Sequence, residues 1–353
     1  MQSDILIVGG GLSGLALATR LHAAGRDVRL IEARDRLGGR ILSEEGFDLG
    51  PAWFWPGQPR IAALTDRLDL KRFDQYTTGA LTFEDEQGRV ERGLGWASME
   101  GSWRLEGGLG RLIEALAQEL PQESIHLSAH VTQVTRTTSG VTTTKAGGAT
   151  CHASHIVLAL PPRIARGLAF DPALPDAALC AMKATPTWMA GQAKAVALYD
   201  RPFWREAGLS GDAMSRRGPM VEIHDASPAT GGPSALFGFI GVPAAARQDS
   251  DALKEALRDQ LGRLFGPEAA NPAKLLLKDW ARDVFTATDL DQRPLHAHPH
   301  YGLPAALSDL WDGRLILSGT ETAAQFGGYL EGALEAADTV YARLTGPGIK
   351  AAS

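Results

Sequence analysis

The stretch that decides the fold lies at the N-terminus, where residues 4–14 read D-I-L-I-V-G-G-G-L-S-G. The apolar run predicts a short buried strand, and the glycines after it are spaced as G-x-G-x-x-G. Apolar residues at helical spacing then predict a helix that ends near Gly25. A second apolar run, residues 28–31, ends in an acid, Glu32. Strand, glycines, helix, strand and terminal acid together indicate a dinucleotide-binding unit.

Each glycine of this motif has a physical role. Gly9 allows a tight turn from strand to helix, Gly11 lets the backbone approach a pyrophosphate, and Gly14 lets the helix pack against the strand. The amide groups at the helix N-terminus then face the phosphates. Glu32 follows Gly14 by 18 residues, about the spacing at which a carboxylate meets an adenosine ribose.

Residues 33–40, A-R-D-R-L-G-G-R, extend the motif. Arg34 and the Gly38-Gly39-Arg40 turn add a second anion-binding feature on the same ligand, and this extension favours FAD over NAD. The alternative is that Arg34 and Arg40 are solvated surface charges.

The composition is that of an ordinary globular protein. The 353 residues are 44% hydrophobic and 22% charged, with a net charge of -6, so nothing indicates nucleic acid or an anionic membrane as a partner. Cys151 and Cys180 have no metal-ligand spacing and favour a reducing compartment. The first apolar run is too short for a signal peptide, and no run approaches the ~18 apolar residues of a membrane helix. We therefore expect a cytoplasmic protein, and its oligomeric state stays open.

The order of predicted elements indicates an α/β protein with a discontinuous Rossmann-like FAD-binding domain. We assign to it residues 1–75, 105–165 and 283–345. A trimmed α+β substrate domain takes residues 76–104 and 166–282, and residues 346–353 form a loose tail. A ligand site is expected in the cleft between the two domains.

Several elements are predicted by their patterns. They are a hairpin over residues 77–92, a linker over 168–187 with a helix near 176–183, a strand over 192–199, and helices over 250–265 and 327–344.

Three adjacent aromatic residues, Trp53, Phe54 and Trp55, follow a turn at Gly50-Pro51. They cannot all face one core, so at least one should point into a cleft or an interface. Plain packing is the alternative.

Lys194 places an ammonium group on an apolar strand. With period two, Gln192, Lys194, Val196 and Leu198 share one face. Burying an unpaired charge is costly, so Lys194 should meet water, an acid or a cofactor, unless this face of the sheet is open to solvent.

The C-terminal stretch 315–336 runs from a strand into Gly319, and Gly327-Gly328 then open a helix. Amides at Tyr329 and Leu330 would face the negative pyrimidine side of a reduced flavin. The alternative is an ordinary capped helix.

The segment H-A-H-P-H-Y, residues 296–301, alternates histidines in a way that can chelate a metal. No acid or cysteine lies close in sequence to complete such a site, and we predict none. The sequence also lacks G-x-S-x-G, H-E-x-x-H and C-x-x-C, so nothing indicates hydrolase or metalloprotease chemistry.

With these motifs in view, the chain resembles the flavin-containing amine oxidase family. The resemblance rests on I-E-A-R-D-R-L-G-G-R at residues 31–40, on the strand around Lys194, and on S-G-T-E-T and G-G-Y-L-E-G-A in residues 318–333. It implies FAD as cofactor. The motifs and the resemblance together assign these residues to FAD: Gly9, Gly11, Leu12, Ser13, Gly14, Glu32, Ala33, Arg34, Gly39, Arg40, Val131, Gly319, Glu321, Thr322, Tyr329 and Leu330.

The resemblance also implies two catalytic residues. Lys194 resembles the lysine that holds a water against flavin N5, and Tyr329 resembles one wall of the aromatic cage that positions the amine. The second wall is not assigned, and Phe285, Trp53, His300 and Tyr301 are all candidates. The substrate-binding candidates are Trp53, Trp55, Phe285 and Tyr301.

The chain departs from the family in two respects. The cysteine that links the flavin in some members is absent from residues 286–289, so FAD should be bound non-covalently. The segment between Arg40 and Gly107 is shorter than in typical members, so the cleft should be more open.

The function that follows is oxidation of the C–N bond of a small-molecule amine, with hydride transfer to flavin N5 and with O2 or another acceptor reoxidising the flavin. The alternatives are a flavin-dependent C–C desaturase or porphyrinogen-type oxidase, and a non-catalytic FAD-binding partner subunit.

Overall fold

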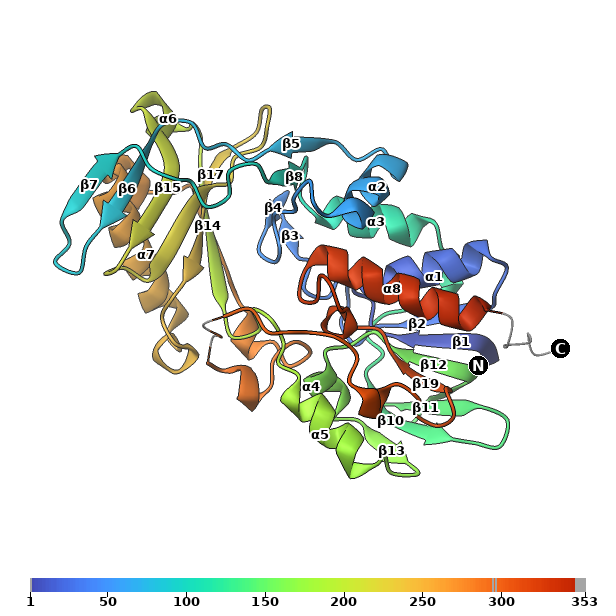
Figure 1. Cartoon of the computed structure of the whole chain (residues 1–353). Coiled ribbons are helices and arrows are strands. Elements are labelled where there is room, and N and C mark those ends of the chain that lie inside the picture. The colour runs from blue at the N-terminus through green and yellow to red at the C-terminus, as the bar shows by residue number, and fades with distance from the viewer. Residues whose placement is uncertain (1, 294, 296, 347–353) are drawn as a thin grey trace.

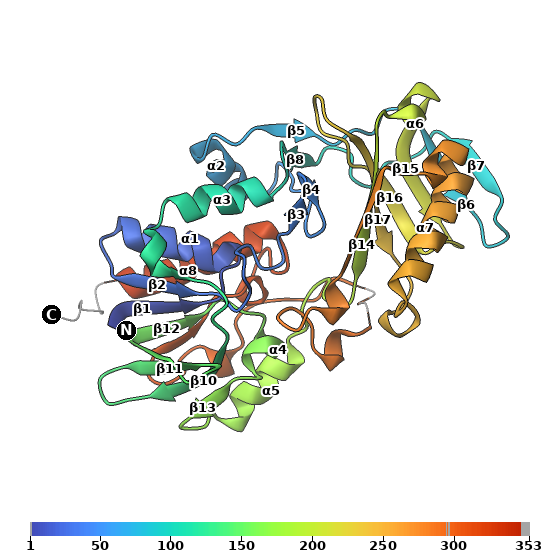
Figure 2. The same ribbon diagram turned by 180° about the vertical axis from the view of Figure 1, so that it is seen from behind.

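The computed structural model describes residues 2–293, 295 and 297–346. The chain forms two large β-sheets that lie side by side, each with helices packed on it (Figures 1 and 2). Two short ribbons connect them: β3 (Ser43–Glu44) with β4 (Phe47–Asp48), and β5 (Arg72–Asp74) with β8 (Trp103–Leu105).

The first sheet has a parallel centre that contains the N-terminal motif. Its strand order is β13-β10-β11-β12-β1-β2-β9, and β19 also pairs with β12. The bounds are β1 (Gln2–Val8), β2 (Val28–Ile31), β9 (Ile125–His126), β10 (Val131–Arg136), β11 (Val141–Lys145), β12 (Thr150–Leu158), β13 (Ala169–Asp171) and β19 (Leu315–Leu317).

Both faces of this sheet are covered, which explains why β1 reads as an unbroken apolar run. Ile5 and Ile7 pack in one core with α1 (Leu12–Ala23), α3 (Gly110–Gln118) and α8 (Leu330–Thr345). Leu6 and Val8 face the opposite core, which β10, β11, α4 (Pro162–Ala165) and α5 (Asp176–Ala184) complete. Helix α2 (Pro59–Arg67) packs beside α8.

The second sheet is mostly antiparallel, with the order β18-β14-β17-β16-β15-β6-β7. The bounds are β6 (Ala80–Glu84), β7 (Val90–Gly93), β14 (Ala193–Tyr199), β15 (Leu209–Ser215), β16 (Met220–Asp225), β17 (Ser234–Ile240) and β18 (Lys274–Asp279). Helix α7 (Ser250–Phe265) covers the outer face, and α6 (Phe203–Glu206) lies at one end (Figure 1). The other face packs against the segment that contains Phe47, Leu49 and Trp53.

Most predicted elements are confirmed. The hairpin is β6–β7, the strand over 192–199 is β14, and the helices over 250–265 and 327–344 are α7 and α8. Strand β15 was not predicted, because its sequence L-S-G-D-A-M-S lacks a strong apolar alternation.

One assignment needs correction. Residues 166–185, which we placed in the substrate domain, form part of the first sheet and its core: β13 pairs with β10, and Ala178 and Met182 of α5 are fully buried against that sheet. Prolines made this stretch look like a linker, but its few apolar residues suffice to dock it. We propose that the boundary between the two domains follows α5. Among the described residues, no helix has the length and apolarity needed to cross a membrane.

Candidate active site

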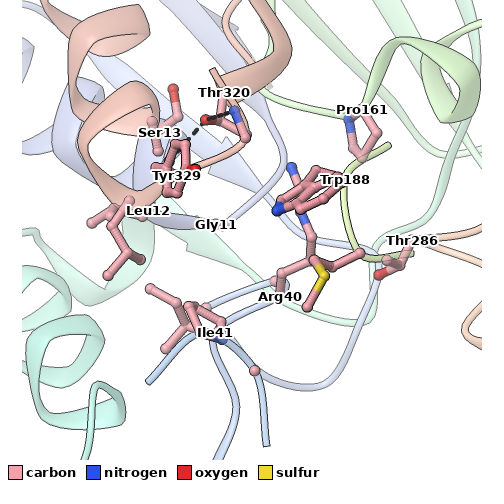
Figure 3. A pocket seen from close by; sticks show the side chains of 18 of the residues that line it. Gly11, Leu12, Ser13, Arg40, Ile41, Pro161, Trp188, Thr286, Thr320 and Tyr329 are labelled. Atoms are coloured by element: carbon pink, nitrogen blue, oxygen red, sulfur yellow. Dashed lines mark hydrogen bonds between the residues drawn. The ribbon is translucent and has the colours of Figure 1, made fainter. Parts of the chain in front are cut away.

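A cavity of about 380 Å³ runs from the N-terminal glycines to the inner face of the second sheet. Figure 3 shows the part of it around Gly11, Arg40 and Tyr329. At one end it is lined by Gly11, Leu12 and Ser13 of the motif, and at the other by Lys194 and Phe239. It thus joins the expected nucleotide site and the expected reaction site in one space.

The glycines of the motif fit the roles given to them. Gly9 has φ +111°, and a Cβ there would lie 2.4 Å from the Ala159 carbonyl oxygen. A Cβ on Gly14 would lie 2.0 Å from the Gly9 carbonyl oxygen, so the helix packs too closely for any side chain. Gly11 is the N-cap of α1 and supplies no side-chain cap, and a Cβ there would meet nothing closer than the Gly38 carbonyl oxygen at 3.9 Å. The first turn of α1 is therefore open to an anionic ligand.

Glu32 lies at the junction of this cavity with a second one of about 330 Å³. Its carboxylate is buried and accepts hydrogen bonds from the Gly10 amide (2.7 Å) and the Arg34 amide (2.9 Å). Val131 and Ala33 line the second cavity. Glu32 therefore lies between the glycine turn that lines the first cavity and Val131 in the second.

The two arginines of the extension are not solvated surface charges. The Arg34 side chain is 12% exposed, pairs with Asp283 and donates to Thr286 Oγ1 at 2.9 Å. Arg40 lines the cavity and pairs with the fully buried Glu321 at 2.6 Å. Among the described residues, none donates to Glu321 Oε2, so Arg40 is the main partner of this buried carboxylate.

The C-terminal stretch closes the site from the other side. β19 ends before Gly319, and the Ser13 hydroxyl contacts Ser318. Tyr329 is the N-cap of α8 and makes no side-chain cap, so the amides of its first turn lack the side-chain acceptor that an ordinary cap supplies. Gly319, Tyr329 and Leu330 all line the cavity.

Lys194 is 5% exposed, so the alternative of a solvent-facing lysine is wrong. Its Nζ donates to the Gly50 carbonyl oxygen at 2.5 Å and lies 5.1 Å from the centre of the Phe239 ring and 5.7 Å from that of Phe237. Burial lowers the pKa of Lys194 to about 8, although the charge of Asp48 opposes this shift.

The three adjacent aromatics divide between two environments, as strand-like alternation requires. Phe54 is fully buried in the core of α1 and α3, whereas Trp53 and Trp55 line the cavity. The expectation that at least one of them faces a cleft is confirmed.

Aromatic rings enclose the cavity near Tyr329. Tyr329 stacks on His298 with ring centres 4.9 Å apart and an angle of 17° between the rings, and Trp188 meets His298 edge-on at 4.8 Å. Figure 3 shows Trp188 and Tyr329 on opposite sides of the space above Arg40 and Ile41.

Sequence reasoning missed several lining residues. Met99, Trp188, Met189 and Phe239 all line the cavity. Trp188 could have been predicted from the sequence, because a tryptophan shortly before the strand of Lys194 is a candidate for lining the same cavity. Phe239 could not have been predicted from the sequence, because its position opposite Lys194 depends on the β14–β17 register.

Four of the residues assigned to the site line neither cavity: Gly14, Glu321, Thr322 and Tyr301. Glu321 forms an ion pair with Arg40, which lines the cavity, and so influences the cavity only indirectly. The Tyr301 hydroxyl donates to the Pro186 carbonyl oxygen, and its ring packs beside Gly327. Phe285 lies beside Arg34 and His130, at the nucleotide end of the site.

The histidine segment holds no recognisable metal centre in the described part of the chain, where no group of three or more His, Cys, Asp or Glu side chains is arranged to hold a metal ion. His296 lies outside the described residues, as does the tail beyond residue 346.

A two-sheet α/β fold with a dinucleotide cradle that opens onto a buried lysine and an aromatic pocket is typical of dinucleotide-dependent oxidoreductases. The sequence profile described as "Flavin containing amine oxidoreductase" matches residues 12–96 and 97–343. The chain therefore belongs to the flavin-containing amine oxidoreductase family, as its motifs predicted.

Similar proteins extend over nearly the whole chain. "Probable flavin-containing monoamine oxidase A" of Dictyostelium discoideum is 25% identical, covering 94% of this chain and 95% of its own length. "Amine oxidase [flavin-containing] B" of Sus scrofa is 24% identical, with 96% and 85% covered.

Solved structures share the fold. A putrescine oxidase bound to putrescine superposes with a TM-score of 0.82 at 23% identity, covering 98% of this chain and 99% of its own. Cyclohexylamine oxidase from Brevibacterium oxydans IH-35A gives the same TM-score at 22% identity, covering 97% and 98%. The predicted fold class is confirmed.

Proposed function

We propose that the protein oxidises the C–N bond of an amine by hydride transfer to N5 of a bound FAD, with O2 or another acceptor reoxidising the flavin. One observation carries this proposal: a single cavity joins the glycine cradle and Glu32 to Lys194 and Tyr329. When bound, FAD supplies the hydride acceptor. Similarity to amine oxidases supports the choice of an amine as substrate.

The chain's own residues fit FAD from end to end. We propose that the first turn of α1 holds the pyrophosphate, Glu32 the adenosine ribose, and Val131 the adenine. Arg40 and the first turn of α8 would favour the negative charge of the reduced flavin. The buried Glu321 fixes Arg40 in place.

We propose that the cofactor is held without a covalent bond. The described residues that line the two cavities include no cysteine, and Cys151 is buried elsewhere, beneath the first sheet. Acid precipitation of the purified protein should leave the yellow colour in the supernatant. Colour that stays with the precipitate would contradict this.

Lys194 and the aromatic rings have separate roles in the proposal. Lys194 holds and orients a polar group or water at the inner end of the cavity, because its ammonium has hydrogen atoms left after the bond to Gly50. Tyr329, with Trp188 across the cavity, orients the amine so that its α-carbon faces the flavin.

The test is anaerobic mixing of the purified protein with a panel of amines, followed by the flavin absorbance band. Bleaching by an amine supports the proposal, and a protein that no amine bleaches contradicts it. With an established substrate, Lys194→Met should slow the reduction. An unchanged rate would refute the role given to Lys194.

A further inference from the structure

A carboxylate lies on the cavity-facing side of the second sheet, two strands from Lys194. Lys194 of β14 pairs with Phe239 of β17, and Phe239 pairs with Glu222 of β16. Directly paired residues point to the same side of a sheet, so these three side chains form one row across it. Because neighbouring strands are about 4.8 Å apart, Glu222 lies about 10 Å from Lys194.

The neighbours of Glu222 lie directly behind the cavity wall. Its Oε1 accepts from Ser98 Oγ at 2.5 Å and is 3.1 Å from His224 Nε2. Ser98 precedes Met99, which lines the cavity, and His224 packs edge-on against the cavity residue Trp53 at 5.3 Å. The Glu222 side chain is 27% exposed, so it lies at the open edge of this wall.

Two further groups hold this carboxylate in its charged form. His224 is buried, and its Nδ1 is 2.7 Å from Asp212 Oδ1. Although burial disfavours the imidazolium, the hydrogen bonds to Asp212 and Glu222 raise the pKa of His224. The hydrogen bond from His224 in turn lowers the pKa of Glu222.

The charges of this cluster do not balance. With His224 protonated, Asp212, His224 and Glu222 carry a net charge of -1. In the described part of the chain, no lysine or arginine pairs with either acid, and no group donates to Glu222 Oε2. Lys194 lies on the other side of Phe239 from Glu222 and already donates a hydrogen bond to the Gly50 carbonyl oxygen. The free oxygen of Glu222 therefore lacks a cation beside the substrate end of the cavity.

We propose that Glu222 binds the second cationic group of a diamine substrate, whose reacting amine lies near Lys194 and Tyr329. This inference rests on the proposed function, because it assumes that the reacting amine occupies that end. The apolar surface of Phe239 between the two polar ends matches a short alkyl chain. Ser98 and the His224–Asp212 pair are positioning residues that fix the carboxylate.

The test separates binding from turnover. Protein whose flavin is fully reduced with dithionite cannot oxidise an amine, so calorimetry under anaerobic conditions measures binding alone. We compare putrescine with n-butylamine, which has the same carbon chain and one amino group. A charge-assisted hydrogen bond predicts about tenfold tighter binding of putrescine than of n-butylamine. This is the low end of the range for hydrogen bonds to charged groups, because Glu222 is partly exposed.

Glu222→Gln should bring the affinity for putrescine to that for n-butylamine and leave the affinity for n-butylamine unchanged. Glu91→Gln, on the exposed edge strand β7, is the matched control and should keep the preference. Ser98→Ala should retain part of the preference for putrescine over n-butylamine. Flavin content and circular dichroism identify any variant that fails to fold, and Ser98→Ala then takes the place of Glu222→Gln.

Equal binding of the two amines by the wild-type protein would overturn the inference, and so would a preference that survives in Glu222→Gln. Turnover is read separately, by bleaching of the oxidised flavin. Tight putrescine binding without bleaching would support the role of Glu222 and contradict the proposed function. Bleaching by both amines, together with equal affinities for them, would support the proposed function and contradict the role of Glu222.

Discussion

Replacing Lys194 with methionine should stabilise the protein at neutral pH. The lysine is 5% exposed and its pKa is lowered from 10.5 to about 8, chiefly by burial. That difference corresponds to about 3 kcal/mol by which the charged form is disfavoured in the folded state. Methionine has a similar length, carries no charge, and can pack against the rings of Phe237 and Phe239.

The effect depends on pH in a defined direction. Between pH 8 and 10.5 the unfolded chain binds more protons at this lysine than the folded protein, so the free energy of unfolding rises with pH. Below pH 8 Lys194 is protonated in both the folded and the unfolded state, so the full cost of burying its charge destabilises the folded protein. The stability advantage of Lys194→Met over the wild type should therefore shrink by about 2 kcal/mol between pH 7 and pH 9.5. Asp48 is the acidic group whose charge acts on Lys194, and burial raises its own pKa to about 6, so it stays ionised throughout this range.

Urea unfolding at the two pH values, followed by tryptophan fluorescence, measures this difference with flavin bound and after its removal. Lys274→Met, which removes an exposed lysine of β18, corrects for the general effect of losing a positive charge. A difference between wild type and Lys194→Met that is the same at both pH values would refute the reasoning. The variant should also lose activity, so a stabilising change and a functional loss are expected together.

Three further outcomes are expected. Gly14→Ala should fail to retain flavin, because its Cβ would lie 2.0 Å from the Gly9 carbonyl oxygen, whereas Gly57→Ala, with open space around it, should retain it; flavin content after purification measures both. Glu321→Gln replaces the charged partner of Arg40 and should cost about 2 kcal/mol in thermal or urea unfolding; an unchanged midpoint would show that the pair contributes nothing. Tyr329→Ala should lower kcat/KM for amines about tenfold, whereas Tyr329→Phe should stay near the wild type, because the proposed role of Tyr329 is that of an aromatic wall; equal losses in both variants would contradict this.

The position of Lys194 illustrates how far sequence alone reached. Period-two alternation in its strand correctly placed Lys194, Val196 and Leu198 on one face. The same reasoning left open whether that face met solvent. Only the packing of residues 47–53 against the sheet decided that it is buried, because those residues lie about 140 positions earlier in the chain.

The sequence by itself was enough to predict the proposed nucleotide end of the site. G-x-G-x-x-G, Glu32 and the Gly38-Gly39-Arg40 turn are contiguous, and their geometry follows from local backbone rules, so no distant contact was needed to read them. The substrate end was decided by the tertiary structure. Phe239 and Glu222 are aligned with Lys194 only through the register of β14, β17 and β16, and Trp188 reaches the same cavity wall as Phe239 only in the tertiary structure. A shift of one residue in a strand would turn these side chains to the other face, and nothing local in the sequence fixes that register.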